Sequence, residues 1–87
     1  MESSILYRIY FENLRPIQSK TIISSLLESC TVYQAVGWWK GHAENTTVVE
    51  VITFEEEKVL KLAEFLRKVN NQESVLVTKI ACEHRFV

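Results

Sequence analysis

The two tryptophans of the chain stand next to each other, as Trp38 and Trp39, in a stretch with strand character. Successive side chains of a strand point to opposite faces of the sheet, so that one indole can enter a core while the other lies on the far face. Both faces of this sheet must therefore offer apolar surface. The small and polar residues 41–46 follow as a predicted hairpin loop, and residues 48–52 return as a strand.

The rest of the chain predicts two helices and two further strands. Residues 5–11 are dense in β-branched and aromatic residues, which favours a strand, and Pro16 suits the first turn of a helix whose apolar stripe ends at Cys30. Thr53 and Glu56 have the spacing of a capping box, and the helix after them carries an apolar stripe as far as Val69. Residues 75–80 predict the last strand, before a tail of residues 82–87.

The resulting order is β-α-β-β-α-β over a single domain of residues 1–87. This order predicts a ferredoxin-like α+β fold, with a four-stranded antiparallel sheet and both helices on one face. A chain of 87 residues buries only about 60–65% of the surface that it exposes when unfolded. Self-association would help to stabilise so small a domain.

Charge and composition exclude several classes of function. Ten basic and eleven acidic residues are interspersed, so that no basic patch for nucleic acid is expected. No apolar run approaches the roughly 18 residues that a membrane span requires, and no signal peptide is evident. Two cysteines are too few for a disulfide scaffold. We expect a cytoplasmic protein with free thiols.

The face of the sheet that the helices leave uncovered is predicted to be half apolar. When every second residue of a strand is assigned to this face, each strand has one polar position between apolar ones. Arg8 and Glu50 are the polar residues of the two central strands and can pair with each other. Such a composition favours a subunit interface over a solvated face. The predicted interface residues are Leu6, Arg8, Tyr10, Val36, Trp38, Val48, Glu50, Ile52, Val75 and Val77.

The stretch from Val36 to Glu44, followed by the apolar strand that ends at Thr53, resembles the PII-like superfamily. Within it the chain resembles the CutA divalent-cation tolerance proteins more than the nitrogen-regulatory PII proteins. The resemblance implies a homotrimer with three open sheets facing inward and with ligands in clefts between subunits. The loop joining the second and third strands, residues 40–47, is far shorter than the regulatory loop of the nitrogen-signalling members. ATP binding and uridylylation are therefore not implied for this chain.

The candidate ligand residues lie around the hairpin and are Trp38, Trp39, Lys40, His42 and Glu44. An indole offers a stacking surface, and an ammonium attracts an anion. No cofactor is expected. No metal site is predicted either, because His42 has no fixed partner ligands, and Cys82 with His84 supplies two ligands where three or four are usual.

These patterns predict an oligomeric PII/CutA-like sensor or adaptor that binds a small molecule or a protein partner, without catalysis. One alternative is a dimeric α+β-barrel enzyme of the cofactor-independent oxygenase or isomerase type. It requires a polar residue in a cavity between helices and sheet, and Tyr7, Tyr33 and His42 are the first suspects. Another alternative is an accessory protein without a small-molecule site.

Overall fold

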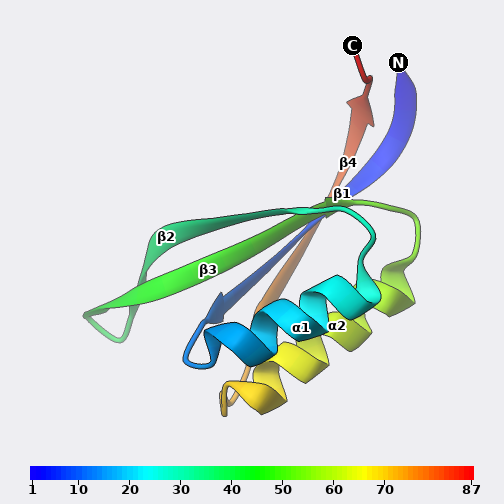
Figure 1. Cartoon of the computed structure of the whole chain (residues 1–87). Helices are drawn as coiled ribbons and strands as arrows, with labels where there is room; N and C mark the ends of the chain where they lie inside the picture. Colours follow the sequence, from blue (N-terminus) through cyan, green and yellow to red (C-terminus); the bar gives the residue numbers. More distant parts are fainter.

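The computed structural model describes residues 1–87 and confirms the ferredoxin-like α+β fold. Its elements are β1 (Glu2–Glu12), α1 (Pro16–Leu26), β2 (Thr31–Trp39), β3 (His42–Ile52), α2 (Glu56–Val69) and β4 (Leu76–His84). The four strands form one antiparallel sheet in the order β2-β3-β1-β4, and both helices cover one side of it (Figure 1). Neither helix is long and apolar enough to cross a membrane.

The core fills the space between the helices and the central strands. Ile9 of β1, Val49 of β3 and Leu62 and Leu66 of α2 are completely buried there. Burying one such side chain contributes about 1.5–3 kcal/mol relative to leaving it in water. The helix stripe and the alternation along β1 and β3 thus produce this packing.

The strand register corrects the predicted face of the two edge strands. Val32 of β2 is paired with the core residue Val49, so the alternation of β2 assigns Val36 and Trp38 to the helix side of the sheet, not to the open face. Val77 of β4 lies opposite Ile9, and Val75 and Val77 both pack against the core. Four of the predicted interface residues, namely Val36, Trp38, Val75 and Val77, were therefore assigned to the wrong face.

Lys79 follows the same corrected alternation and faces α2. Its Nζ donates to Glu56 Oε1 at 2.8 Å, and the hydroxyl of the buried Tyr7 donates to the same oxygen at 3.1 Å. The Lys79 ammonium, followed by the Tyr7 hydroxyl, lowers the pKa of the Glu56 carboxyl. These contacts attach the edge strand β4 to the first turn of α2.

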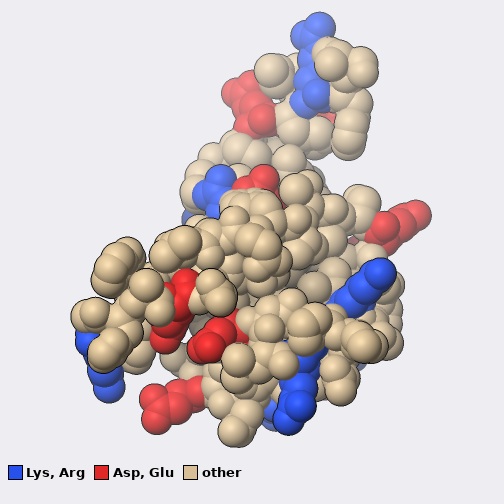
Figure 2. Space-filling model, turned by 60° about the vertical axis from the view of Figure 1, so that its left-hand side comes forward, with Lys and Arg blue, Asp and Glu red and all other residues tan.

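The open face carries the other half of each strand. A polar network crosses its centre: Arg8 Nε donates to Glu50 Oε2 at 2.8 Å, and the Tyr33 hydroxyl donates to the same oxygen at 3.2 Å. The Arg8 guanidinium holds the pKa of the Glu50 carboxyl below its ordinary value. Apolar side chains surround the network, and Leu76 and Ile80 remain 60% and 46% exposed. Figure 2 shows a broad area without charged groups across the middle of the molecule in this view.

The hairpin is tighter than predicted. Strands β2 and β3 are joined by Lys40 and Gly41 alone, both with positive φ (50° and 80°), and residues 42–46 belong to β3 rather than to a loop. Positive φ at both central residues is the requirement of the type I′ turn, which matches the twist of paired strands. The register runs through Gly37 without interruption, so β2 has no bulge at this glycine.

Three details at the ends of elements differ from the sequence analysis. The predicted tail continues as β4 as far as His84, with Cys82 opposite Ser4 of β1. Helix α1 ends at Leu26, so Cys30 lies beyond it and is exposed instead of completing the apolar stripe. Thr53 Oγ1 accepts the Glu55 backbone N–H at 3.1 Å, but α2 begins only at Glu56, without a side-chain cap on its N-cap residue.

Candidate ligand site at the hairpin end of the sheet

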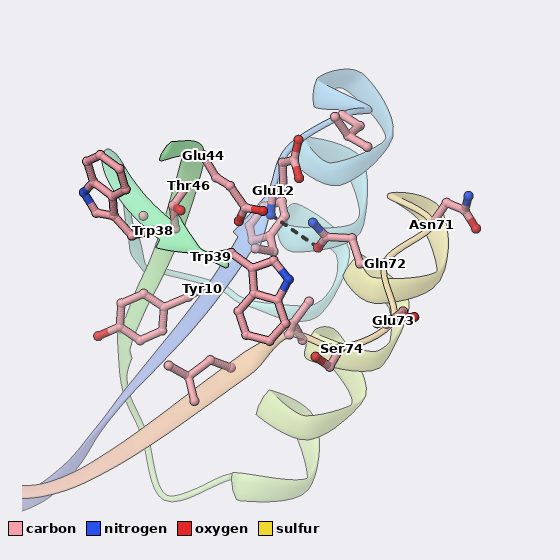
Figure 3. Close-up of a pocket in the computed structure, with 15 residues that line it drawn as sticks. Tyr10, Glu12, Trp38, Trp39, Glu44, Thr46, Asn71, Gln72, Glu73 and Ser74 are labelled. Carbon is pink, nitrogen blue, oxygen red and sulfur yellow. Dashed lines mark hydrogen bonds between the residues drawn. The ribbon is translucent and has the colours of Figure 1, made fainter. Parts of the chain in front are cut away.

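An open hollow of about 640 Å³ lies where β1 ends, beside the β2–β3 hairpin and the loop between α2 and β4 (Figure 3). Three segments far apart in the sequence line it, because the antiparallel order brings the end of β1, the start of β4 and the hairpin together. Its lining residues are Tyr10, Phe11, Glu12, Leu14, Gly37, Trp38, Trp39, Glu44, Thr46, Asn71, Gln72, Glu73, Ser74, Val75 and Leu76.

Gly37 forms the part of the wall where β2 approaches β3. A Cβ atom at this position would collide with the Thr46 hydroxyl, whereas a Cβ atom at Gly41 would meet nothing within 4 Å. A larger residue at position 37 would therefore require the Thr46 side chain to move. Gly37 and the Thr46 hydroxyl together shape this part of the wall.

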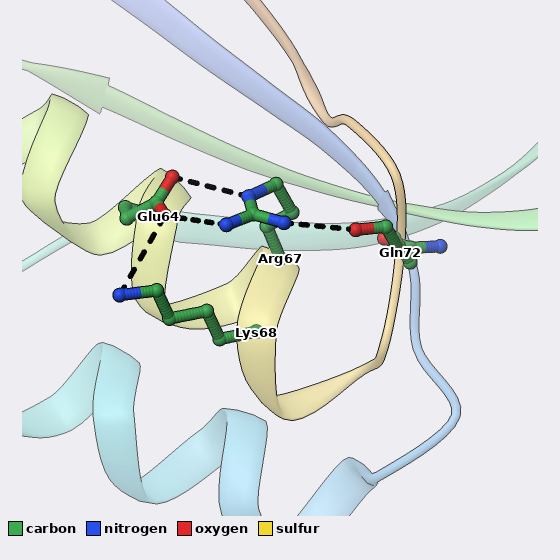
Figure 4. Close-up of polar contacts among 4 residues, drawn as sticks. All are labelled: Glu64, Arg67, Lys68 and Gln72. Carbon is green, nitrogen blue, oxygen red and sulfur yellow. Dashed lines mark hydrogen bonds and ion pairs between the residues drawn. The ribbon is translucent and has the colours of Figure 1, made fainter.

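The opposite wall is the loop between α2 and β4, and hydrogen bonds fix it. The Glu12 backbone N–H donates to Gln72 Oε1 at 3.3 Å, and the Gln72 backbone N–H donates to the Arg67 carbonyl at 3.0 Å. Arg67 Nη1 also donates to the Gln72 carbonyl at 3.2 Å (Figure 4). This wall is thus held from α2 and from β1 before any ligand arrives.

The C-terminal end of α2 is held by an ion pair and by the buried side-chain amide of Asn70. Arg67 forms two hydrogen bonds to the Glu64 carboxylate, at 2.6 and 3.1 Å, and lowers the pKa of that carboxyl. The Asn70 side chain is buried, accepts the Arg15 backbone N–H at 2.8 Å and donates to Ser19 Oγ at 3.0 Å. These bonds connect the start of α1 to the end of α2 beneath the hollow.

The structure brings three of the five predicted ligand residues to the hollow. Trp38, Trp39 and Glu44 line it, whereas Lys40 and His42 do not. The Lys40 ammonium lies over the Trp39 ring, 5.5 Å from the ring centre, and His42 is an exposed residue paired with Trp39 across the hairpin. His42 and Tyr33 lie on the open face, so of the three residues suspected for an α+β-barrel cavity only Tyr7 faces the helices.

Sequence reasoning missed Glu12, Thr46 and the wall of residues 71–76. The predicted strand order could have indicated these residues, because it places the end of β1 and the start of β4 at the same end of the sheet as the hairpin. Tyr10 was assigned to the subunit interface, and it also lines the hollow. The site is therefore larger and less basic than the predicted one.

Cys82 and His84 lie at the other end of the sheet, beside a smaller hollow of about 290 Å³. Cys82 Sγ is 3.2 Å from Ser4 Oγ, and His84 Nε2 is 3.3 Å from Glu2 Oε2. No group of three or more His, Cys, Asp or Glu side chains is arranged to hold a metal ion.

No protein-family model and no curated protein matches the sequence. Among solved structures, the chain is similar to a phage SAM lyase in the apo state, at 21% identity and a TM-score of 0.73, with 93% of this chain and 86% of that chain covered. It is also similar to CPII, a nitrogen regulatory PII-like protein from Thiomonas intermedia K12 solved with ADP, AMP and bicarbonate (13% identity, TM-score 0.63, 98% of both chains).

A third similar structure is CutA1 from Oryza sativa, at 16% identity and a TM-score of 0.57, with 97% of this chain and 83% of that chain covered. The fold is thus the one shared by PII-like and CutA proteins. The resemblance that the hairpin motif indicates is confirmed at the level of the fold.

Proposed function

We propose that this chain is a PII/CutA-like sensor or adaptor that forms a homotrimer through the open face of its sheet and binds a small molecule or a protein partner at clefts between subunits. The hollow at the hairpin end contributes one wall of each cleft. This proposal involves no catalysis and includes a cytoplasmic location, which two unpaired thiols suit.

The observation that carries the proposal is the open face itself. It combines exposed apolar side chains with a polar network in which Arg8 and Glu50 neutralise each other and Tyr33 donates to the same carboxylate. Burying such a face removes apolar area from water at about 25 cal/mol per Å² without leaving a charge unpaired. The interface residues proposed are now Leu6, Arg8, Tyr10, Glu50 and Ile52, joined by Leu76 and Ile80, whereas Val48 of the same face is already buried within the chain.

The hollow supports ligand binding at the edge of this interface. It has an anchored wall, the exposed indole of Trp39 and several polar groups around one space, which are the usual features of a small-molecule site. CPII has been solved with adenine nucleotides and bicarbonate. These ligands are the first to be screened against this chain.

Native mass spectrometry and light scattering test the assembly. We expect a mass of three chains at micromolar concentration, and the variant Ile80→Asp should give single chains that retain the far-ultraviolet circular dichroism of the wild type, since Ile80 contributes nothing to the helix-side core. A wild-type protein that stays a single chain at these concentrations would refute the proposal. A dimer would instead favour face-to-face packing of two sheets.

The second candidate function is an enzyme that acts on S-adenosylmethionine. The overlap with the phage SAM lyase, which extends over 93% of this chain, favours it, together with two carboxylates, Glu12 and Glu44, beside the exposed indoles of the hollow. Incubation of the purified protein with S-adenosylmethionine, followed by chromatography, tests it directly. Consumption that Glu44→Gln abolishes would establish an enzyme, and unchanged substrate would remove this candidate.

A further inference from the structure

We propose that the hollow at the hairpin end selects an organic cation whose charge is surrounded by carbon substituents, such as a quaternary ammonium group. This inference rests on the proposed ligand site and names its ligand class. Among the 15 lining residues are three glutamates, Glu12, Glu44 and Glu73, and neither lysine nor arginine. The charged side chains of the lining are thus all negative, whereas the net charge of the whole chain is only −1.

The two carboxylates nearest the sheet lack a counter-charge. Glu12 and Glu44 are both half-buried, and none of the ion pairs of the molecule involves either of them. An ionised carboxylate without a counter-charge attracts a bound cation and repels a bound anion. The charge of these two side chains therefore favours a cationic ligand.

Aromatic rings provide the second feature of a cation site. Tyr10, Trp38 and Trp39 line the hollow, and the indoles of Trp38 and Trp39 are 74% and 57% exposed. A cation over an indole face gains about 0.5–2 kcal/mol, more as water is excluded. The Lys40 ammonium lies over the Trp39 ring, 5.5 Å from the ring centre, so a ligand cation must displace Lys40 or use the other face of the ring.

The arrangement of these groups suits a substituted cation better than a bare ammonium. Figure 3 shows Glu44 and Glu12 near the Gln72 amide on one side of the space, with the Trp39 ring on another side. Carbon substituents around the charge pack against the indole while the charge remains within reach of the carboxylates. A phosphate group would meet the carboxylates and find no basic side chain in the lining.

A pair of probes that differ in charge and hardly in shape tests the inference. Choline and 3,3-dimethylbutan-1-ol have the same branched outline, but only choline is positively charged. Titration of each into the wild-type protein, with the two indole N–H resonances followed by NMR, yields both dissociation constants. We expect choline to bind at least about tenfold more tightly, because the neutral probe lacks both the ion pair and the cation–π attraction.

Matched variants locate the effect. The double variant Glu12→Gln/Glu44→Gln should weaken choline binding about tenfold or more and leave the neutral probe unchanged. Glu57→Gln serves as the control, since Glu57 is an exposed residue of α2 outside the hollow. Equal effects of the double variant and the control would place the cation elsewhere and overturn the inference.

The outcomes separate this inference from the proposed function. Equal affinity for choline and its neutral analogue, tighter binding of ADP than of choline, or no binding of choline would each overturn the cation assignment, even in an intact trimer. A single chain in solution that prefers choline would refute the trimeric module and retain the cation site, because all 15 lining residues come from one chain.

Discussion

The two faces of the sheet differ in how completely the chain covers them. On the helix side, Ile9, Val49 and Leu62 are fully buried, and the polar contacts, such as Lys79 with Glu56, lie at the margin. On the open side, Val48 is buried by its strand neighbours, but Leu76 and Ile80 are left in water around a closed polar network.

The difference indicates which surface the chain completes by itself. Packing on the helix side requires nothing beyond residues 1–87, and its stability should not depend on protein concentration. The open side gains its remaining burial only from another molecule, so its contribution should follow mass action. Two substitutions, one on each side of the sheet, can therefore test whether only the open side depends on association.

The largest effect is expected on the helix side. Leu62→Ala removes a fully buried side chain from the core, which typically costs about 2–5 kcal/mol of unfolding free energy. Urea unfolding measures this cost, and we expect it to be the same at 2 and at 200 µM protein, about the range over which mass action shows.

Ile80→Ala is the matched change on the open side. In a single chain it should cost less than about 0.5 kcal/mol, because Ile80 is a surface residue there. In a trimer the loss should appear as weaker association, so that the variant dissociates at a higher concentration than the wild type, and the loss should vanish where both proteins are single chains. A large loss that persists at concentrations where both proteins are single chains would mean that the open face is not an interface.

The hairpin wall gives the next largest effect. Gly37→Ala places a Cβ atom against the Thr46 hydroxyl, and such overpacking costs about 1–3 kcal/mol. The second substitution Thr46→Ala removes that hydroxyl and should restore most of the loss, as thermal unfolding of the single and double variants would measure.

Gly41→Ala is the control for this pair. Its backbone has φ of +80° but nothing lies within 4 Å, so the expected cost is about 1–2 kcal/mol of backbone strain. Thr46→Ala should leave that cost unchanged. Rescue of both glycine variants by Thr46→Ala would show that the collision at position 37 is not the cause.

The sequence predicted the helix side more accurately than the open side. Apolar stripes in α2 and alternation in β1 and β3 are local patterns, and each defines a buried surface without knowledge of its partner. The edge strands carry apolar residues on both faces of the sheet. At β4, Val75 and Val77 belong to the helix side, and Leu76 and Ile80 belong to the open side. Alternation alone then leaves two choices of face, and only the pairing with β1 decides between them.

The candidate site was predicted in part for a similar reason. The two indoles and Glu44 lie close together in the sequence, so a local motif was sufficient to find them. Glu12 and Gln72 are 60 residues apart and meet only because β1 ends where the α2–β4 loop passes. The two-residue turn was missed because Lys40 with positive φ is an uncommon choice for a position that asparagine or aspartate usually occupies.

The smallest effect concerns the polar network on the open side. Because Arg8 lowers the folded-state pKa of Glu50, the ionised carboxylate stabilises the fold fully above the ordinary pKa of about 4.5, and this contribution is lost as pH falls through the lower, folded-state pKa. The pair is partly exposed, so Glu50→Gln at pH 7 should change the unfolding equilibrium only about two- to fivefold.

Urea unfolding from pH 7 to pH 3 measures the effect of the substitution at pH 7 and the loss of stability in acid. Glu50→Gln should flatten the acid limb of the stability profile, whereas Glu57→Gln, which changes the net charge equally, should not. A larger change, especially one that disappears when the protein is diluted to single chains, would mean that Arg8 and Glu50 lie within the assembled interface and lose water there. The open face would then contribute to stability through its charges as well as through its apolar rim.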